Sequence, residues 1–242
     1  IQNASSLLKN LIVEENIGEN GRGIMVKYSD VNIYNSIVRN NNEGNSAGGI
    51  YCHNSNFIGD NLEIYNNSGS IGGAGILIDN NVQNTRSVTI KNSKIFDNVS
   101  GTGGGGLGLN NSNVLLENTV IYNNTGYNAG GGIKTNGTYS NTTINNCTIA
   151  NNLSTTTPHT SNIGNSDYDT ELLIITNSII YHQSLDNWGF DTPTLLEIEY
   201  TFANSFYDIY EFDGSGNLYG NPLFVDSDNG DNHLSDHSLC IG

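Results

Sequence analysis

The sequence has 242 residues, 36% of them hydrophobic, and 24 acidic residues against 8 basic ones give a formal net charge of -16. Its 42 asparagines and 29 glycines disfavour long helices, which excludes a helical bundle. The acidic balance leaves no basic surface for nucleic acid or anionic lipid, and no run of about 18 apolar residues is present, so we expect neither nucleic-acid binding nor membrane insertion by this chain.

An internal repeat built around asparagine dominates the chain. The pattern apolar-x-apolar-x-Asn-x-x-(Ile or Val) recurs in one phase, with anchors 25 to 31 residues apart. The anchors are Asn10, Asn35, Asn61, Asn92, Asn118, Asn146 and Asn177. A second asparagine stands six residues later, at Asn16, Asn41, Asn67, Asn98, Asn124 and Asn152. Glycine clusters between the anchors lead into a further short apolar stretch, so each unit predicts about three short strands.

A unit of about 26 residues with three short strands cannot bury its own apolar face, so successive units must stack. We therefore expect an all-β fold, a right-handed parallel β-helix of about seven coils over residues 1–183. Each strand would pair with its counterpart one coil away, at about 4.8 Å; strand twist favours the right-handed sense. The two asparagine columns are expected at corners, where stacked amides hydrogen-bond along the column.

The repeat fades near the C-terminus, and residues 184–242 are richer in acidic and aromatic residues. We expect this segment to be a cap packed on the last coil, hiding its strand edges, and not an independent domain. At the other end, Leu7, Leu8 and Ile12 already stand in full repeat phase. This favours the removal of a preceding coil or cap; the alternative is a short cap made from the first few residues.

Segments near the C-terminus resemble a known family. GNPLFVD at 220–226, NGDNHL at 229–234 and SLCI at 238–241 are similar to the closing segment of secreted bacterial right-handed parallel β-helix repeat proteins of the choice-of-anchor Q type. The coils more loosely resemble the repeats of polymorphic outer-membrane adhesins. Leu239 departs from the proline common in the family, and the chain stops at Gly242 where relatives run on toward an anchoring region. The resemblance implies an extracellular or cell-surface location and no uniform activity.

The three cysteines do not suggest a disulfide. Cys52 and Cys147 occupy inward positions about four coils apart, or about 19 Å, which exceeds the roughly 7 Å limit for a bridge. Cys240 lies in the terminal segment without an evident partner. We expect three free thiols, two of them in the core.

An aromatic column is the first candidate binding surface. Four residues after the anchors, at a position expected to face outward, stand Tyr65, Phe96, Tyr122 and Tyr181. A ladder of flat rings suits the stacked sugar rings of a linear polysaccharide. The alternative is that the rings pack on one another or under a neighbouring loop.

A second outward column offers polar chemistry. Lys27, His53 and Asp79 would be neighbours at one-coil spacing, which supplies a base, an acid and an orienting carboxylate. β-Helix polysaccharide lyases and hydrolases place catalysis on such a face. An acidic chain with only three arginines is poorly suited to holding an acidic glycan, and the alternative is a solvated face.

Metal binding has one candidate segment. Asp226, Asp228 and Asp231 alternate with other residues in a turn, as calcium ligands do. Gly230 falls one place too early for an EF-hand loop and no glutamate closes the segment, so the alternative is a turn without metal. We expect no other cofactor.

These observations predict an extracellular or cell-surface β-helix that acts as a non-catalytic adhesion or polysaccharide-binding module. Its partner would be a polysaccharide, a surface glycan or another surface protein. The alternatives are a carbohydrate-active enzyme that uses the face near Lys27, His53 and Asp79, and a structural spacer of a surface layer.

Overall fold

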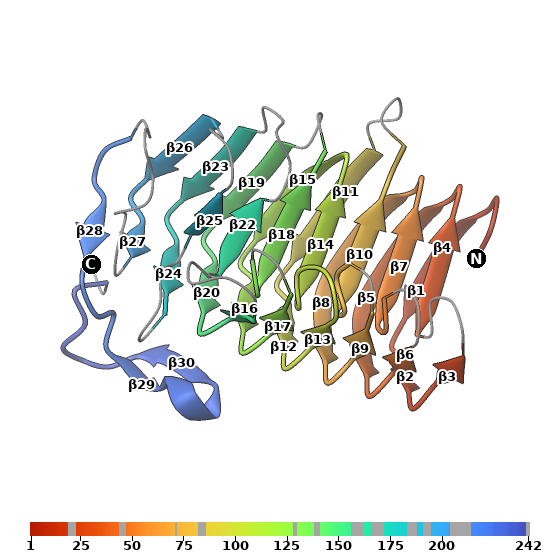
Figure 1. The fold of residues 1–242 in the computed structure, drawn as a ribbon, viewed down its shortest axis with the longest axis horizontal. Helices are drawn as coiled ribbons and strands as arrows, with labels where there is room; N and C mark the ends of the chain where they lie inside the picture. Colours follow the sequence, from red (N-terminus) through yellow and green to blue (C-terminus); the bar gives the residue numbers. More distant parts are fainter. Residues whose placement is uncertain are drawn as a thin grey trace.

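The computed structural model describes residues 1–18, 23–43, 47–70, 72–81, 86–127, 130–137, 141–155, 162–165, 172–182, 188–190, 195–203 and 214–240. In these residues the chain is all-β except for one short 3-10 helix. Most of its strands stack in parallel along one axis, with the N-terminal coil at one end and the C-terminal segment at the other (Figure 1).

The stack is a parallel β-solenoid of about 6 turns, which confirms the predicted fold class. The expected number of about seven coils is slightly too high. The right-handed sense of the coil stays a prediction.

Three parallel sheets run along the axis of the described structure. The first, the seven-strand sheet, contains β4 (Ile24–Lys27), β7 (Ile50–His53), β10 (Ile76–Asp79), β14 (Leu107–Asn110), β18 (Ile133–Asn136), β22 (Ile163–Asn165) and β25 (Trp188–Phe190). The second, of six short strands, contains β3 (Ile17–Gly18), β6 (Asn42–Glu43), β9 (Ser68–Gly69), β13 (Val99–Ser100), β17 (Thr125–Gly126) and β21 (Leu153–Ser154).

The third sheet is the largest and folds around the corner at the anchor asparagines. Its strands before that corner are β1 (Ser5–Lys9), β5 (Asp30–Arg39), β8 (Asn56–Tyr65), β11 (Arg86–Lys91), β15 (Ser112–Glu117), β19 (Asn141–Asn145), β23 (Leu172–Thr176) and β26 (Leu195–Glu199). Those after the corner are β2 (Ile12–Glu14), β12 (Lys94–Phe96), β16 (Val120–Tyr122), β20 (Thr148–Ala150), β24 (Ile179–Tyr181), β27 (Phe202–Ala203) and β28 (Leu218–Tyr219), while β5 and β8 continue through the corner.

Inward columns of apolar side chains form one continuous core. In the seven-strand sheet Val26 pairs with Cys52, and Cys52 with Ile78, and all three side chains are fully buried. Each such residue contributes about 1.5–3 kcal/mol by burial. The period of two in a strand thus sends alternate residues to the core and leaves the residues between them on the outer surface.

The corners depend on the left-handed backbone conformation. All seven anchor asparagines have φ between 49° and 57°. Asparagine tolerates this region better than other residues with a Cβ, because its short amide bonds locally. Glycine is required for a different reason at Gly49, where a Cβ would lie 2.3 Å from the carbonyl oxygen of Gly75 in the next coil.

Stacked strands continue beyond residue 183. β26 pairs with β23, β27 with β24, and β28 with β27. An antiparallel hairpin of β29 (Phe224–Asp226), η1 (Ser227–Asn229) and β30 (Asp231–Leu234) then leaves the stack (Figure 1). Residues 204–213, which hold much of the acidic and aromatic composition expected of a cap, lie outside the described residues.

The first coil is the least covered part of the stack. Leu8 and Val13 pack on the core but are only partly buried, and the outward side chains Leu7 and Ile12 are exposed. No helix in the described part of the chain is long and apolar enough to cross a membrane.

Candidate functional site

The seven-strand sheet brings the second predicted column together on its outer surface. Lys27 pairs with His53, His53 with Asp79, and Asp79 with Asn110, so these residues occupy one register position in successive strands. We use the name His53 face for Lys27, Tyr28, Tyr51, His53, Asn54, Asp79 and Asn110. Strand spacing of about 4.8 Å places adjacent members within side-chain reach.

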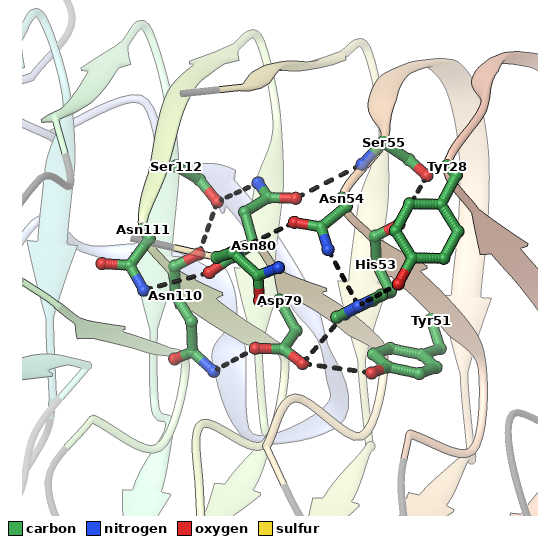
Figure 2. A network of polar contacts seen from close by, with 11 residues as sticks. Tyr28, Tyr51, His53, Asn54, Ser55, Asp79, Asn80, Asn110, Asn111 and Ser112 are labelled. Atoms are coloured by element: carbon green, nitrogen blue, oxygen red, sulfur yellow. Dashed lines mark hydrogen bonds and ion pairs between the residues drawn. The ribbon is translucent and has the colours of Figure 1, made fainter. Parts of the chain in front are cut away.

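His53 and Asp79 form the centre of this face (Figure 2). The Nδ1 atom of His53 lies 3.3 Å from Oδ2 of Asp79, with the two side chains 20% and 38% exposed. The carboxylate favours the tautomer in which Nδ1 carries the proton and donates it to Asp79.

The second ring nitrogen of His53 is also engaged. Nδ2 of Asn54 lies 2.9 Å from Nε2, and the hydroxyl of Tyr28 lies 3.5 Å from the same atom (Figure 2). In the tautomer set by Asp79, Nε2 is an acceptor and Asn54 donates to it. Both polar atoms of the imidazole are therefore occupied within the protein.

Two tyrosine rings flank the His53–Asp79 pair. Tyr51 donates its hydroxyl proton to Oδ2 of Asp79 at 3.1 Å. Tyr28 meets the His53 ring edge to face, with centroids 5.4 Å apart, and is 52% exposed. Burial raises the pKa of Tyr51 above its ordinary value, and the negative charge of Asp79 adds to the shift.

Lys27 stands apart from the His53–Asp79 pair. Its Nζ lies over the Tyr51 ring, 5.9 Å from the centroid, in a cation–π contact. Tyr51, Tyr28 and Asn54 were missed in the sequence, although their positions beside the outward column in the same strands and corners would have been enough to include them.

The backbone beneath the His53 face is fixed by a buried polar corner. Tyr28 and Asn54 both have positive φ, at 51° and 46°. The backbone N–H of Ser29 donates to the hydroxyl of Ser55, and that of Ser55 to Oδ1 of Asn80. Nδ2 of Asn80 then donates to the Ser112 hydroxyl at 2.9 Å (Figure 2). This column holds the outer side chains in one register.

The rings of the aromatic column do not form a ladder of exposed ring faces. Tyr65 and Phe96 stack with centroids 4.7 Å apart, and Phe96 and Tyr122 with centroids 4.9 Å apart, at interplanar angles of 9° and 4°. The ring faces therefore cover one another, which is the packed alternative. Arg39 extends the column, because it donates to the Tyr65 hydroxyl at 2.8 Å and pairs with Glu14 at 2.6 Å.

Tyr181 does not continue this stack, and the expectation that its ring is exposed is wrong. Its strand partner Ala150 separates it from Tyr122, and Tyr181 itself is only 7% exposed. Phe224 of the C-terminal hairpin packs on the Tyr181 ring edge to face, with centroids 5.9 Å apart. The hairpin thus covers the ring of Tyr181.

The inner asparagine column forms a continuous ladder that is buried from Asn41 onward. Each Nδ2 donates to Oδ1 of the next asparagine at 2.8–3.0 Å, and each backbone N–H donates to the same atom at 2.9–3.2 Å. Its members are Asn16, Asn41, Asn67, Asn98, Asn124, Asn152 and Asn162. The predicted hydrogen-bonded ladder is confirmed, and its role is structural.

The outer anchor column is less regular. Asn61 donates to Asn35 at 2.9 Å and Asn118 to Asn92 at 3.3 Å. Asn92, however, turns to Asp60, and Asn177 turns to Asn145. Because these amides are exposed, water competes for their bonds, and the backbone conformation is the main reason for asparagine at the anchors.

The calcium candidate has little built geometry. Asp226 and Asp231 are cross-strand partners in the hairpin, Asn229 donates to Asp226 at 2.9 Å, and His233 pairs with Asp231 at 2.5 Å. The side chain of Asp228 lies outside the described residues. No group of three or more His, Cys, Asp or Glu that could hold a metal occurs among the residues that the structure describes.

The cysteines are placed as expected. Cys52, Cys147 and Cys240 are all free, and the first two are buried. Burial raises the pKa of the Cys147 thiol to about 11, which keeps it protonated and unreactive at neutral pH. The core thiols therefore contribute packing rather than chemistry.

Comparisons with known proteins add no assignment. No family model, no curated protein and no solved structure matches the chain.

Proposed function

We propose that this protein is an extracellular or bacterial cell-surface β-helix that binds a polysaccharide or surface glycan through the His53 face without catalysing a reaction. The observation that carries the proposal is the exposed Tyr28 ring against His53, on the same face as the Asp79 carboxylate, which Tyr51 and His53 hold in place. A sugar presents an apolar face to an aromatic ring and hydroxyl protons to an acceptor. The resemblance of residues 220–241 to secreted bacterial β-helix proteins supports the location.

The aromatic column is less suited to this role. Tyr65, Phe96 and Tyr122 offer only ring edges along their stack, since each inner face is covered by a neighbour. The hairpin also lies against the far end of the stack, where a Cβ on Gly230 would come 2.8 Å from Cε2 of Tyr122. The binding role predicted for these rings therefore gives way, in this proposal, to the His53 face.

Catalysis at the same face is the second candidate, and the His53–Asp79 pair is the observation that favours it. A general base needs a free nitrogen within reach of the proton that it removes. In His53 that nitrogen already accepts from Asn54. Lys27 is directed at the Tyr51 ring and not at the His53–Asp79 pair.

Binding is tested by affinity electrophoresis of the purified protein in gels that contain soluble polysaccharides, together with pull-down on insoluble ones. Tyr28→Asn removes the exposed ring and suits the positive φ of this corner, where Asn54 has the same conformation. We expect retention to fall about tenfold, the size of one lost aromatic contact, with no loss of stability. Tyr200→Asn is the matched control, because Tyr200 is also exposed and has φ 49°.

The same samples are assayed for new reducing ends and unsaturated products. Product release that His53→Ala abolishes would overturn the non-catalytic proposal in favour of an enzyme. If the protein neither retains a polysaccharide nor releases products, the structural rod is the function that is left. End-to-end or lateral self-association is then the expected behaviour. Equal loss in Tyr28→Asn and Tyr200→Asn would place binding elsewhere on the rod.

A further inference from the structure

We infer that the glycan taken by the His53 face is an uncharged, hydroxyl-rich polymer and not a polyuronate. This inference rests on the proposed function and concerns the chemistry of the same site. It follows from which hydrogen-bonding atoms of the face are already engaged and which are left for a ligand.

The donors near Asp79 are engaged inside the protein. The Tyr51 hydroxyl donates to Oδ2 at 3.1 Å, and Nδ1 of His53 lies 3.3 Å from the same atom. Nδ2 of Asn54 is directed at Nε2 of His53 at 2.9 Å. A ligand carboxylate, which only accepts hydrogen bonds, could accept a proton engaged in these contacts only by breaking the contact.

The Asp79 carboxylate, by contrast, can still accept hydrogen bonds from a ligand. An ionised carboxylate has about four lone-pair positions. Oδ2 of Asp79 takes two donors, whereas among the described residues Oδ1 has only a 3.5 Å contact from Asn110, and the side chain is 38% exposed. The open atom of Asp79 is therefore an acceptor, which suits a sugar hydroxyl.

The negative charge of the protein also favours an uncharged ligand over a polyuronate. A uronate carboxylate near Oδ1 would meet the Asp79 charge, and the lysine in the column, Lys27, has its Nζ over the Tyr51 ring. The whole chain carries 24 acidic against 8 basic residues, so a polyanion is also repelled at long range. An uncharged polymer meets neither penalty.

The test compares dissociation constants for uncharged polymers (glucans, mannans and xylan) with those for polyuronates (polygalacturonate and alginate), at low and high salt. We expect at least one uncharged polymer to bind with an affinity that salt leaves unchanged, and polyuronates to bind at least tenfold more weakly. Asp79→Asn should weaken the uncharged polymer about tenfold, because a bond to a charged acceptor becomes a neutral one. Glu63→Gln, which removes a charge from an exposed residue on another sheet, should not.

Unfolding midpoints of Asp79→Asn and Glu63→Gln establish that both variants fold. A polyuronate that binds as tightly as any uncharged polymer would overturn the inference, and loss of that binding in Tyr28→Asn would leave the proposed function standing. A cationic polymer that binds best and is released by salt would overturn it equally. If no polymer is retained, the proposed function fails and the inference with it.

Discussion

Asn152 donates a hydrogen bond to Asn162 at 2.8 Å, although only ten residues separate the two in the chain. In the rest of the ladder the donor and acceptor come from asparagines one coil apart, at separations of 25 to 31 residues. Asn162 extends the ladder from a different position in the coil, because its carbonyl oxygen accepts from Ile133 at the start of the seven-strand sheet. The amide column is thus maintained where the repeat in the sequence becomes irregular.

The ladder should contribute far more to stability than the exposed anchors. Asn124→Ala removes a buried amide that donates to Ile95, Tyr122 and Asn152. It also removes the oxygen that accepts from Nδ2 and from the backbone N–H of Asn98. We expect the free energy of unfolding to fall by about 3–5 kcal/mol. Asn118→Gly, which keeps the left-handed corner, should change it by less than about 1 kcal/mol. Urea denaturation measures both, and equal effects would contradict a structural role for the buried ladder.

The sequence predicts this architecture well because the asparagine anchors fix the phase of each coil. Two features follow directly from that phase: the inward column that contains Cys52, and the shared register of Lys27, His53 and Asp79. Asn162 could not be found in the same way, since it stands where other coils have glycine, as at Gly132.

Contacts between distant segments of the chain were the other feature that the sequence could not predict. The C-terminal hairpin contacts the coils where Nδ2 of Asn151 donates to the carbonyl oxygen of Ser227. These two residues are 76 residues apart, and nothing in the repeat predicts this contact. Likewise, the engagement of His53 by Asn54 depends on side-chain direction at a corner. The periodicity places residues on a face, but the bonds that they form within the face depend on rotamers and on neighbouring loops.

The aromatic stack should act as a structural element and not as a binding surface. Phe96→Ala removes the ring that contacts both Tyr65 and Tyr122, and we expect it to lower the free energy of unfolding by about 2 kcal/mol. Phe96→Tyr keeps the ring and should cost less than about 0.5 kcal/mol. Glycan retention should be the same in both variants. Retention that falls in Phe96→Ala at temperatures where it is fully folded would restore the ladder as the binding site.

The C-terminal hairpin should detach when its closest approach is blocked. Gly230 has φ 82°, and a Cβ there would lie 2.8 Å from Cε2 of Tyr122, so Gly230→Ala is disfavoured both by the backbone and by the contact. We expect faster amide hydrogen exchange in residues 224–234, with the coils unchanged. Val225→Ala on the exposed side of the same hairpin is the control. Unchanged exchange in Gly230→Ala would mean that the hairpin is held mainly by Phe224 and Asn151.

Alkaline pH should weaken the His53 face through Tyr51. Its folded-state pKa is raised above the ordinary value of about 10, chiefly by burial, so the neutral phenol is favoured in the folded state. The stability that it contributes is complete below pH of about 10 and is lost as the pH rises toward the folded pKa, because only the unfolded state releases the proton in that window. Unfolding midpoints measured from pH 8 to about 11 should therefore decline more in the wild type than in Tyr51→Phe, and parallel declines would show that other tyrosines account for the loss.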